Sequence, residues 1–172
     1  MSSAAGPAKT EKPGLKARAQ YGALPYRTSG GLEVMLITSR ETGRWVIPKG
    51  WPMKGKTAPE AAAREALEEA GVEGEVDKPV GSYAYTKFGK RGVGVPCKVK
   101  VFPLKVTAQR DTWREQGERE VRWFEARAAA DAVQERQLAR LIRKFAKKAR
   151  RAEARLPSSP SGDFPSEGQE RL

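Results

Sequence analysis

The chain has 172 residues, of which 38% are hydrophobic and 31% are charged, and it carries a formal net charge of +12. These values predict one soluble globular domain of ordinary size with a hydrophobic core of its own. The sequence contains no histidine and a single cysteine, Cys97. This excludes internal disulfides, cysteine-based zinc sites and every catalytic or metal site that needs an imidazole. Any catalysis must therefore use carboxylates, lysines, arginines, hydroxyl groups or the backbone.

The positive charge is concentrated near the two ends. Residues 1–20 contribute +3 and residues 134–156 contribute +7, so most of the excess lies in a tail and in one helical segment. No apolar run approaches the roughly 18 residues that are needed to span a membrane. The N-terminal residues also lack the apolar stretch of a secretory signal, so we expect a cytoplasmic protein without a membrane segment.

The N-terminal half is predicted to form a hairpin, a short extended piece and a helix. The turn sequence TSGG separates two strand-like segments, over residues 20–27 and 32–38, and residues 45–47 form the extended piece. The helix covers residues 57–70. Thr57 is its expected N-cap and Glu60 completes a capping box, while Gly71 is expected to end the helix.

The C-terminal half is predicted to add strands over residues 80–88, 97–107 and 121–124 and helices over residues 127–133 and 135–155. Cys97 lies in one of these strands and is expected to be a buried small hydrophobe. The last helix has an apolar stripe at helical spacing and basic residues on its other faces. Such a basic face is usually only solvated, although it also suits RNA or another polyanion. No RNA-reading motif accompanies it, so we do not favour nucleic acid as a partner.

This order of elements predicts an α/β protein with an α/β/α sandwich around a mixed β-sheet. The domain is expected to cover residues 18–155 and to end in the long basic amphipathic helix. Residues 1–17 are expected to form a disordered basic tail, and residues 156–172 a disordered Pro/Ser-rich tail.

Three glutamates share one side of the predicted helix over residues 57–70. Glu65, Glu68 and Glu69 fall within an arc of about 100° at the helical period, opposite a face rich in alanine. Like charges at this spacing repel, and a divalent cation would remove the repulsion. Ligands that are all oxygen select a hard metal such as Mg²⁺ or Mn²⁺. The alternative interpretation is an acidic helix face that is simply solvated.

The surrounding stretch GWPMKGKTAPEAAAREALEEAGV, residues 50–72, resembles the Nudix box Gx5Ex7REUxEExGU, in which U is apolar. Gly50 matches the opening glycine, and residues 64–72 match the closing REUxEExGU. Lys56 departs from the pattern, because it stands where the box has its first glutamate. With TSRETGRWVIPKG before the box and GEREVRWFEARAA after it, the chain is similar to the diphosphoinositol polyphosphate phosphohydrolase branch, which also hydrolyses diadenosine polyphosphates. The similarity covers roughly residues 18–145.

The resemblance implies a Nudix fold and metal-dependent hydrolysis of a pyrophosphate bond by attack of water at phosphorus, with Mg²⁺ or Mn²⁺. It implies that Glu65, Glu69 and the carbonyl of Gly50 bind the metal. Glu68 is then the first choice for general base, and Arg64 orients a glutamate. Because family members differ in the residue that acts as base, three further candidates remain: Glu115, Glu118 and Glu120.

The resemblance also indicates residues for contact with the polyphosphate: Arg18, Ser39, Arg40, Lys49 and Arg119. Arginine and lysine suit multi-phosphate recognition, although each of these residues is also compatible with a solvated surface position. Trp45 and Trp123 are expected to be core residues that flank the site. Lys56 either contacts substrate phosphate or, as we prefer, is solvated in its loop.

Two alternatives to this function remain open at the level of sequence. The first is a pyrophosphohydrolase of another substrate, namely an RNA 5′ end, a nucleotide sugar or a nucleoside triphosphate. The second is a Nudix-fold binding module without catalysis, which only Lys56 favours. The sequence does not determine the oligomeric state or the number of metal ions.

Overall fold

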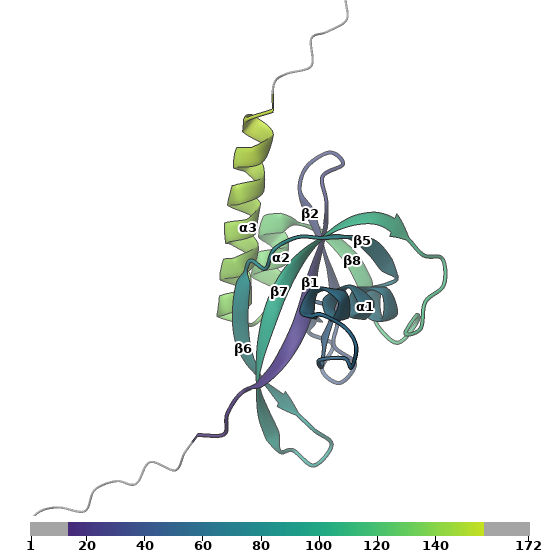
Figure 1. The fold of residues 1–172 in the computed structure, drawn as a ribbon, viewed down its shortest axis with the longest axis vertical. Coiled ribbons are helices and arrows are strands. Elements are labelled where there is room, and N and C mark those ends of the chain that lie inside the picture. The colour runs from purple at the N-terminus through teal and green to yellow at the C-terminus, as the bar shows by residue number, and fades with distance from the viewer. Residues whose placement is uncertain (1–13, 157–172) are drawn as a thin grey trace, which may run out of the picture.

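A mixed β-sheet organises the chain (Figure 1). The computed structural model describes residues 14–156, which form one eight-stranded sheet and three helices. The strands are β1 (Arg18–Arg27), β2 (Glu33–Thr38), β3 (Trp45–Val46), β4 (Lys49–Gly50), β5 (Val72–Val76), β6 (Gly81–Phe88), β7 (Gly94–Gln109) and β8 (Val121–Glu125). The helices are α1 (Ala58–Ala70), α2 (Ala126–Ala132) and α3 (Arg136–Ala154).

Strands β1 and β7 lie side by side at the centre of the sheet and are parallel, with Arg18 opposite Cys97 at one end of the register and Tyr26 opposite Lys105 at the other. The other pairings are antiparallel. Strand β7 pairs with β5 and β6, strand β1 pairs with β2 and β4, and strand β2 pairs with β3 and β8. The sheet is therefore mixed, as the sequence predicts.

Helix α1 forms as its end signals predict. The Thr57 side chain accepts a hydrogen bond from the Glu60 amide, and the Glu60 carboxylate accepts one from the Thr57 amide at 2.8 Å. Gly71 ends the helix with a φ of 69°, in the left-handed region that favours glycine. Ala66 and Ala70 are fully buried among residues of the sheet. These small side chains let α1 lie close to the sheet. The close packing fixes the orientation of the helix and therefore the position of the face that carries the glutamates.

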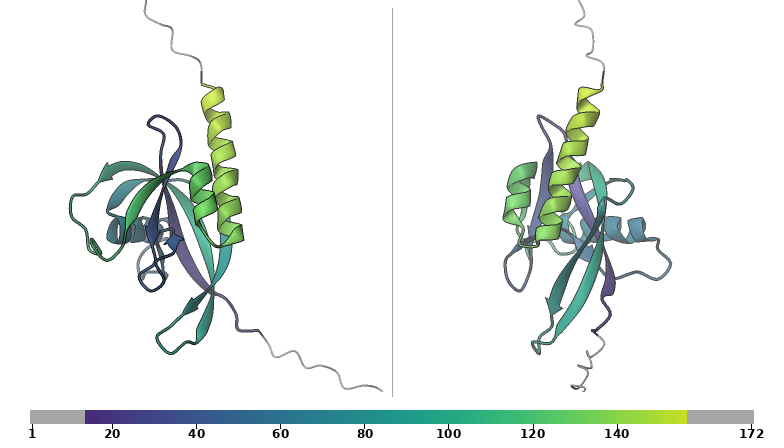
Figure 2. Two further views of the ribbon diagram at one scale, coloured as in Figure 1. Left: turned by 180° about the vertical axis from the view of Figure 1, so that it is seen from behind. Right: turned by 90° about the vertical axis from the view of Figure 1, so that its left-hand side faces the viewer.

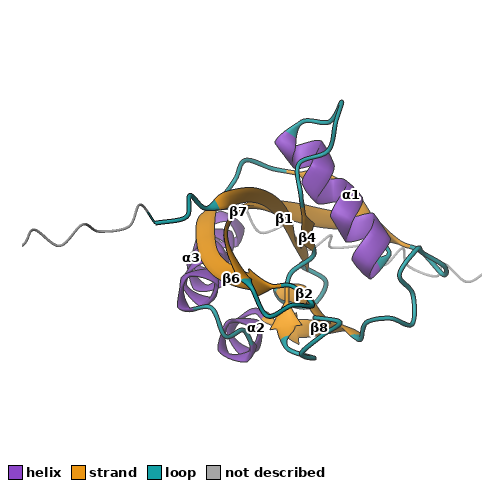
Figure 3. Cartoon of the chain, turned by 90° about the horizontal axis from the view of Figure 1, so that it is seen from below, coloured by secondary structure: helices purple, strands orange, loops and turns teal. Residues whose placement is uncertain are grey.

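Helices α2 and α3 cover the opposite face, so the sheet lies between helical layers (Figure 3). They lie side by side, and α3 continues past the end of α2 (Figure 2). Leu138, Ile142 and Phe145 of α3 are buried against the sheet, and the Phe145 ring meets the Tyr26 ring edge-on at 4.9 Å between centroids. The predicted α/β/α sandwich with a long C-terminal amphipathic helix is confirmed.

The structure differs from the prediction mainly in short strands. Strands β4 and β5 were not predicted, and β7 extends at both ends beyond the predicted residues 97–107. Cys97 is buried as a free thiol, as expected. Trp45 and Trp123 are half-buried, and each packs against one of the two hydrophobic clusters.

The predicted tails fall almost wholly outside the part of the chain that the structure describes, since residues 1–13 and 157–172 are not described. Within residues 14–156, no helix combines the length and the apolar character that a membrane crossing requires.

Candidate active site

One cleft brings the carboxylates of α1 together with cationic side chains. It has a volume of about 650 Å³ and receives residues from α1, β4, β6 and the loops that follow β2 and β7. Its acidic lining consists of Glu41, Glu65, Glu68, Glu69, Glu115 and Glu118. Its cationic lining consists of Arg40, Arg44, Lys49, Lys87, Arg114 and Arg119. The cleft therefore holds equal numbers of carboxylates and cations, so it presents oxygen ligands beside groups that attract phosphate.

Glu65 lies directly over the α-carbon of Gly50, at the end of β4. A Cβ atom on Gly50 would lie 2.0 Å from Glu65 Oε1 and 2.3 Å from its Cδ, so only glycine leaves room for this carboxylate. Burial, together with the charges of Glu68 and Glu115, raises the pKa of Glu65. The structure thus brings together the opening glycine of the motif and the first glutamate of its REUxEE segment.

Glu69 is the most enclosed carboxylate of the cleft. It is 8% exposed, and its Oε2 accepts a hydrogen bond of 3.1 Å from the Lys49 amide. Its Oε1 accepts one of 3.2 Å from the Arg119 guanidinium. Burial raises the pKa of Glu69 to about 7, although the Arg119 and Lys49 charges act in the opposite direction. The Glu69 carboxylate is consequently held by β4 through Lys49 and by the loop after β7 through Arg119.

Glu68 is less buried and is bound by two arginines. Arg64 donates from Nε to Glu68 Oε1 at 2.8 Å, one helical turn away, and Arg114 donates to the same oxygen at 3.4 Å. The backbone carbonyl of Glu68 also accepts a hydrogen bond from the Glu115 amide at 3.0 Å. Helix α1 thereby anchors the loop that brings Glu115 to the cleft.

The three later glutamates have different surroundings. Glu115 lies 3.3 Å from the Arg40 guanidinium and 3.7 Å from that of Arg119. Glu118 lies 3.3 Å from Arg40. Glu120 forms its ion pair with Arg122 at 2.6 Å and does not line the cleft. Of the reserve candidates for general base, Glu115 and Glu118 therefore lie in the cleft and Glu120 does not.

Aromatic rings contact several cationic side chains in and beside the cleft. Lys49 Nζ lies 5.1 Å from the centre of the Tyr85 ring, and desolvation by burial lowers the Lys49 pKa. The Trp51 ring has Arg18 Cζ at 4.2 Å and Lys87 Nζ at 5.2 Å from its centre. Such contacts orient flexible cationic side chains without neutralising their charge.

Most of the predicted site residues meet in this cleft. Those that line it are Gly50, Glu65, Glu68, Glu69, Ser39, Arg40, Lys49 and Arg119. Arg64 and Arg18 do not line it and touch it through their contacts with Glu68 and Trp51. Arg119, predicted as a substrate contact, also donates to the Thr38 carbonyl at 3.1 Å and is only 10% exposed at its side chain, so it has a positioning role towards Glu69. Lys56 is exposed and lies outside the lining.

Several lining residues were not singled out from the sequence, among them Arg44, Trp51, Tyr85 and Arg114. Trp51 directly follows Gly50, so its place inside the motif was a signal. The strand alternation of β6 puts Tyr85 on the same side as Lys87, which is a weaker signal. Nothing in the sequence singled out Arg44 or Arg114.

The donors in the cleft suit a hard divalent cation. Carboxylate oxygens and the Gly50 carbonyl are the ligand types that Mg²⁺ and Mn²⁺ prefer, and the glycine leaves the space that Glu65 occupies. Within residues 14–156, the acidic side chains are not already gathered into a cluster of three at metal-binding spacing. Glu68 and Glu69 instead pair with arginines, which compensate part of the carboxylate charge that a bound cation would compensate.

A mixed sheet between helical layers, with a glutamate-rich helix beside a cationic cleft, is the arrangement that a Nudix hydrolase would have. The description "NUDIX domain" belongs to the family model that matches residues 16–145. The chain therefore belongs to the NUDIX family. Among curated proteins, it is 33% identical over 126 residues to Nudix hydrolase 17, mitochondrial, of Arabidopsis thaliana, covering 69% of this chain and 68% of that protein.

A second relative bears on the branch of the family. The chain is 31% identical over 124 residues to diphosphoinositol polyphosphate phosphohydrolase 3-alpha of Mus musculus, covering 70% of this chain and 71% of that protein. For eight similar curated proteins, the alignments span between 52% and 71% of their lengths. Membership in the family and the hydrolase relatives place the chain in the class of Nudix pyrophosphohydrolases.

Solved structures agree on the fold. An Ap4A hydrolase of C. elegans in a binary complex gives a TM-score of 0.58 at 23% identity and covers 80% of this chain and 99% of its own. The E. coli dihydroneopterin triphosphate pyrophosphohydrolase gives 0.59 at 20% identity, with 77% and 99% covered. At these identities the likeness shows the fold alone.

Proposed function

We propose that this protein hydrolyses a pyrophosphate bond in a diphosphoinositol polyphosphate or a diadenosine polyphosphate and depends on Mg²⁺ or Mn²⁺. The observation that carries the proposal is the composition of the cleft. Carboxylates from α1 line the same space of about 650 Å³ as six lysine and arginine side chains. A substrate with many phosphates needs the cations, and the hydrolysis of an anhydride needs the carboxylates.

In this proposal, Glu65, Glu69 and the Gly50 carbonyl hold the cation. When bound, the cation neutralises phosphate charge and makes water a better nucleophile. Glu68 accepts the proton of the attacking water. Its two arginine partners fix the direction of the carboxylate within the cleft. Glu115 is the alternative base, because it lies in the cleft and pairs with both Arg40 and Arg119.

Three observations support the substrate class. The first is that Arg40, Lys49 and Lys87 line the cleft, where a substrate with several phosphates would meet their positive charge. The second is the mouse relative, whose name specifies a diphosphoinositol polyphosphate. The third is the fold shared with proteins described as Ap4A hydrolases. Trp51 and Tyr85 add aromatic surface that an adenine could contact. The proposal therefore keeps both diphosphoinositol polyphosphates and diadenosine polyphosphates as substrates.

A substrate panel tests the proposal. The purified protein is assayed with Mg²⁺ and separately with Mn²⁺ on a diphosphoinositol pentakisphosphate, diadenosine tetraphosphate, a nucleotide sugar, a nucleoside triphosphate and RNA with a 5′-triphosphate. We expect kcat/KM to be highest for one of the first two. A preference of orders of magnitude for one of the other three would contradict the substrate class. Binding without turnover on every compound would instead favour a non-catalytic module.

The cytoplasmic location expected from the sequence stays a prediction. Fluorescence imaging of the tagged full-length chain in its native cell would test it, and a signal confined to an organelle would contradict it.

A further inference from the structure

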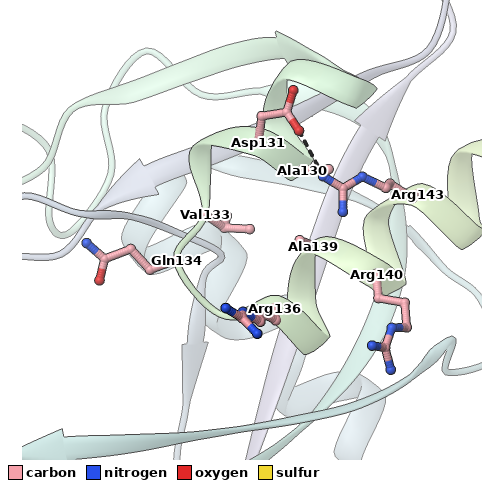
Figure 4. A pocket seen from close by; sticks show the side chains of 8 residues that line it. All are labelled: Ala130, Asp131, Val133, Gln134, Arg136, Ala139, Arg140 and Arg143. Carbon is pink, nitrogen blue, oxygen red and sulfur yellow. Dashed lines mark hydrogen bonds and ion pairs between the residues drawn. The ribbon is translucent and has the colours of Figure 1, made fainter.

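A second concave site lies between α2 and α3 (Figure 4). This α2–α3 groove has a volume of about 450 Å³. Its lining consists of Ala130, Asp131, Val133, Gln134, Arg136, Ala139, Arg140 and Arg143. None of these residues lines the active-site cleft, and Gln134 meets it only by accepting a hydrogen bond of 2.9 Å from Arg44 of the cleft lining. The groove is therefore a separate feature, which the proposed hydrolysis does not use.

Positive charge dominates the groove. Arg136, Arg140 and Arg143 follow one another at i, i+4 and i+7, so they share one side of α3, and all three are exposed. The one carboxylate in the lining is Asp131, which is 74% exposed and lies 2.8 Å from Arg143. Within residues 14–156, Arg136 and Arg140 form no ion pair. Two arginines of the lining thus have no carboxylate partner within the described residues.

The arrangement leaves the centre of the groove open. Figure 4 shows Asp131 and Arg143 at one end and Arg136 and Arg140 at the other, with the small side chains of Val133 and Ala139 between them. Small side chains between cations give a shallow apolar floor with charged walls. A ligand in the groove would meet arginines at both ends.

The kind of side chain indicates the kind of ligand. Arginine binds phosphate through a planar fork of donors, which favours it where several phosphate oxygens must be satisfied together. The eight lining residues include no aromatic side chain, although sequence-tolerant binding of single-stranded nucleic acid relies on stacking of bases on aromatic rings. The volume also falls within the range of small-ligand sites. These three points favour a compact ligand that is recognised by its phosphates alone.

We propose that the α2–α3 groove binds a compact anion with two or more phosphate groups, separately from the active site. The basic face of α3 continues beyond the groove with Lys144, Lys147 and Lys148, which are exposed and do not line it. These lysines attract anions to the same helix without forming a concave site. They therefore provide a matched control for charge that is merely diffuse.

The test is a site-resolved titration of the ¹⁵N-labelled full-length protein with tripolyphosphate in the absence of divalent metal. Backbone amide shifts of Ala130 and Ala139 report the groove, and that of Gly50 reports the cleft. In wild type, we expect the groove signals to saturate with their own dissociation constant. Replacing Arg136, Arg140 and Arg143 together by Gln should weaken binding at the groove tenfold or more and leave the Gly50 titration unchanged.

The matched variant replaces Lys144, Lys147 and Lys148 by Gln, which removes the same charge from the same helix. We expect it to weaken groove binding by less than threefold. Equal weakening in the two triple variants, or no groove shifts at millimolar tripolyphosphate, would overturn the proposal. If the arginine triple variant does not fold, Arg140→Gln alone serves, because this side chain has no ion-pair partner, and a loss of threefold or more is then expected.

A second pair of variants tests the direction of the effect. Asp131→Asn removes the competing carboxylate and releases Arg143, so groove affinity should rise threefold or more. Glu153→Gln makes the same charge change on an exposed part of α3 outside the lining and should change affinity by less than twofold. An equal gain in both would contradict a built site. Tenfold tighter binding of a single-stranded RNA than of tripolyphosphate at the groove would also contradict the proposal and favour a nucleic-acid surface.

Discussion

Gly50→Ala tests whether the close approach of α1 to β4 matters for catalysis. The added Cβ would lie 2.0 Å from Glu65 Oε1, and an ordinary contact begins at 3.4 Å, so the oxygen must move by about 1.4 Å. Displacements of about 1 Å in a catalytic group cost on the order of 100-fold in rate. We therefore expect kcat/KM to fall at least about 100-fold, which corresponds to about 2.7 kcal/mol in the activation free energy.

The same substitution should leave the fold nearly intact. Gly50 does not have a positive φ, so alanine is compatible with its backbone, and the displaced group is the end of a flexible side chain. The loss of chain entropy in the unfolded state favours alanine by about 0.4–1 kcal/mol and offsets part of the strain. We expect the melting temperature to change by less than about 4 °C.

The assay measures initial rates on the preferred substrate at saturating Mg²⁺, with thermal unfolding measured on the same preparations. Gly89→Ala is the matched control, because nothing lies within 4 Å of a Cβ at that position and its φ is not positive. Wild-type activity in the Gly50 variant would refute the reasoning, since the geometry would then have no consequence for the reaction. Equal losses in both variants would refute it as well.

Three further outcomes follow from the site and its supports. Arg119→Ala should lower the free energy of unfolding by about 3 kcal/mol, because it removes a nearly buried cation from its carboxylates. Arg40 is 58% exposed at its side chain, so Arg40→Ala should lower the free energy of unfolding by less than about 1 kcal/mol. Equal losses for the two variants in urea titrations would be inconsistent with this. Gly71→Ala should cost about 2 kcal/mol, since its φ is positive and a Cβ would lie 2.5 Å from Trp113; an unchanged unfolding midpoint would argue against it. Mg²⁺ at 100 times its dissociation constant should raise the free energy of unfolding of wild type by about 2.7 kcal/mol and should not raise that of the Glu65→Gln variant. Calorimetry that finds the same increase in both proteins would exclude Glu65 as a ligand.

The capping signals in the sequence predicted the bounds of α1 to within one residue. The helix was predicted over residues 57–70 and is observed over Ala58–Ala70, with Thr57 as the cap and Gly71 in the left-handed region. These signals depend only on neighbours within one helical turn, which is why the sequence reveals them. The arc of three glutamates follows from the same periodicity.

Long-range pairing determined what the sequence missed. Strand β4 has two residues and exists because Lys49 and Gly50 pair with Gly22 and Tyr21 of β1. Strand β5 reads VEGEV, with a central glycine and two charges, so its composition does not favour a strand. It forms against the far end of β7, where the register shifts between Glu73 and Gly74. No local pattern encodes such contacts.

The partners of the glutamates show the same limit within the site. Helical spacing places Arg64 one turn before Glu68, but no basic residue lies one turn from Glu69 in the sequence. The structure supplies Arg119 from a loop 50 positions later in the chain. This contact makes Arg119 a support of Glu69 as well as a wall of the cleft. Only the folded chain reveals that double role.

The central claim, a carboxylate-held metal that drives pyrophosphate hydrolysis, is tested most directly by the Mg²⁺-dependent turnover of Glu69→Gln. Its circular dichroism spectrum should match that of wild type, and Glu75→Gln, an exposed position on β5, controls for loss of one carboxylate. We expect turnover to fall at least about 1,000-fold in Glu69→Gln, or about 4 kcal/mol in activation free energy, and to stay at the wild-type level in Glu75→Gln. Undiminished Mg²⁺-dependent turnover in Glu69→Gln would contradict the account.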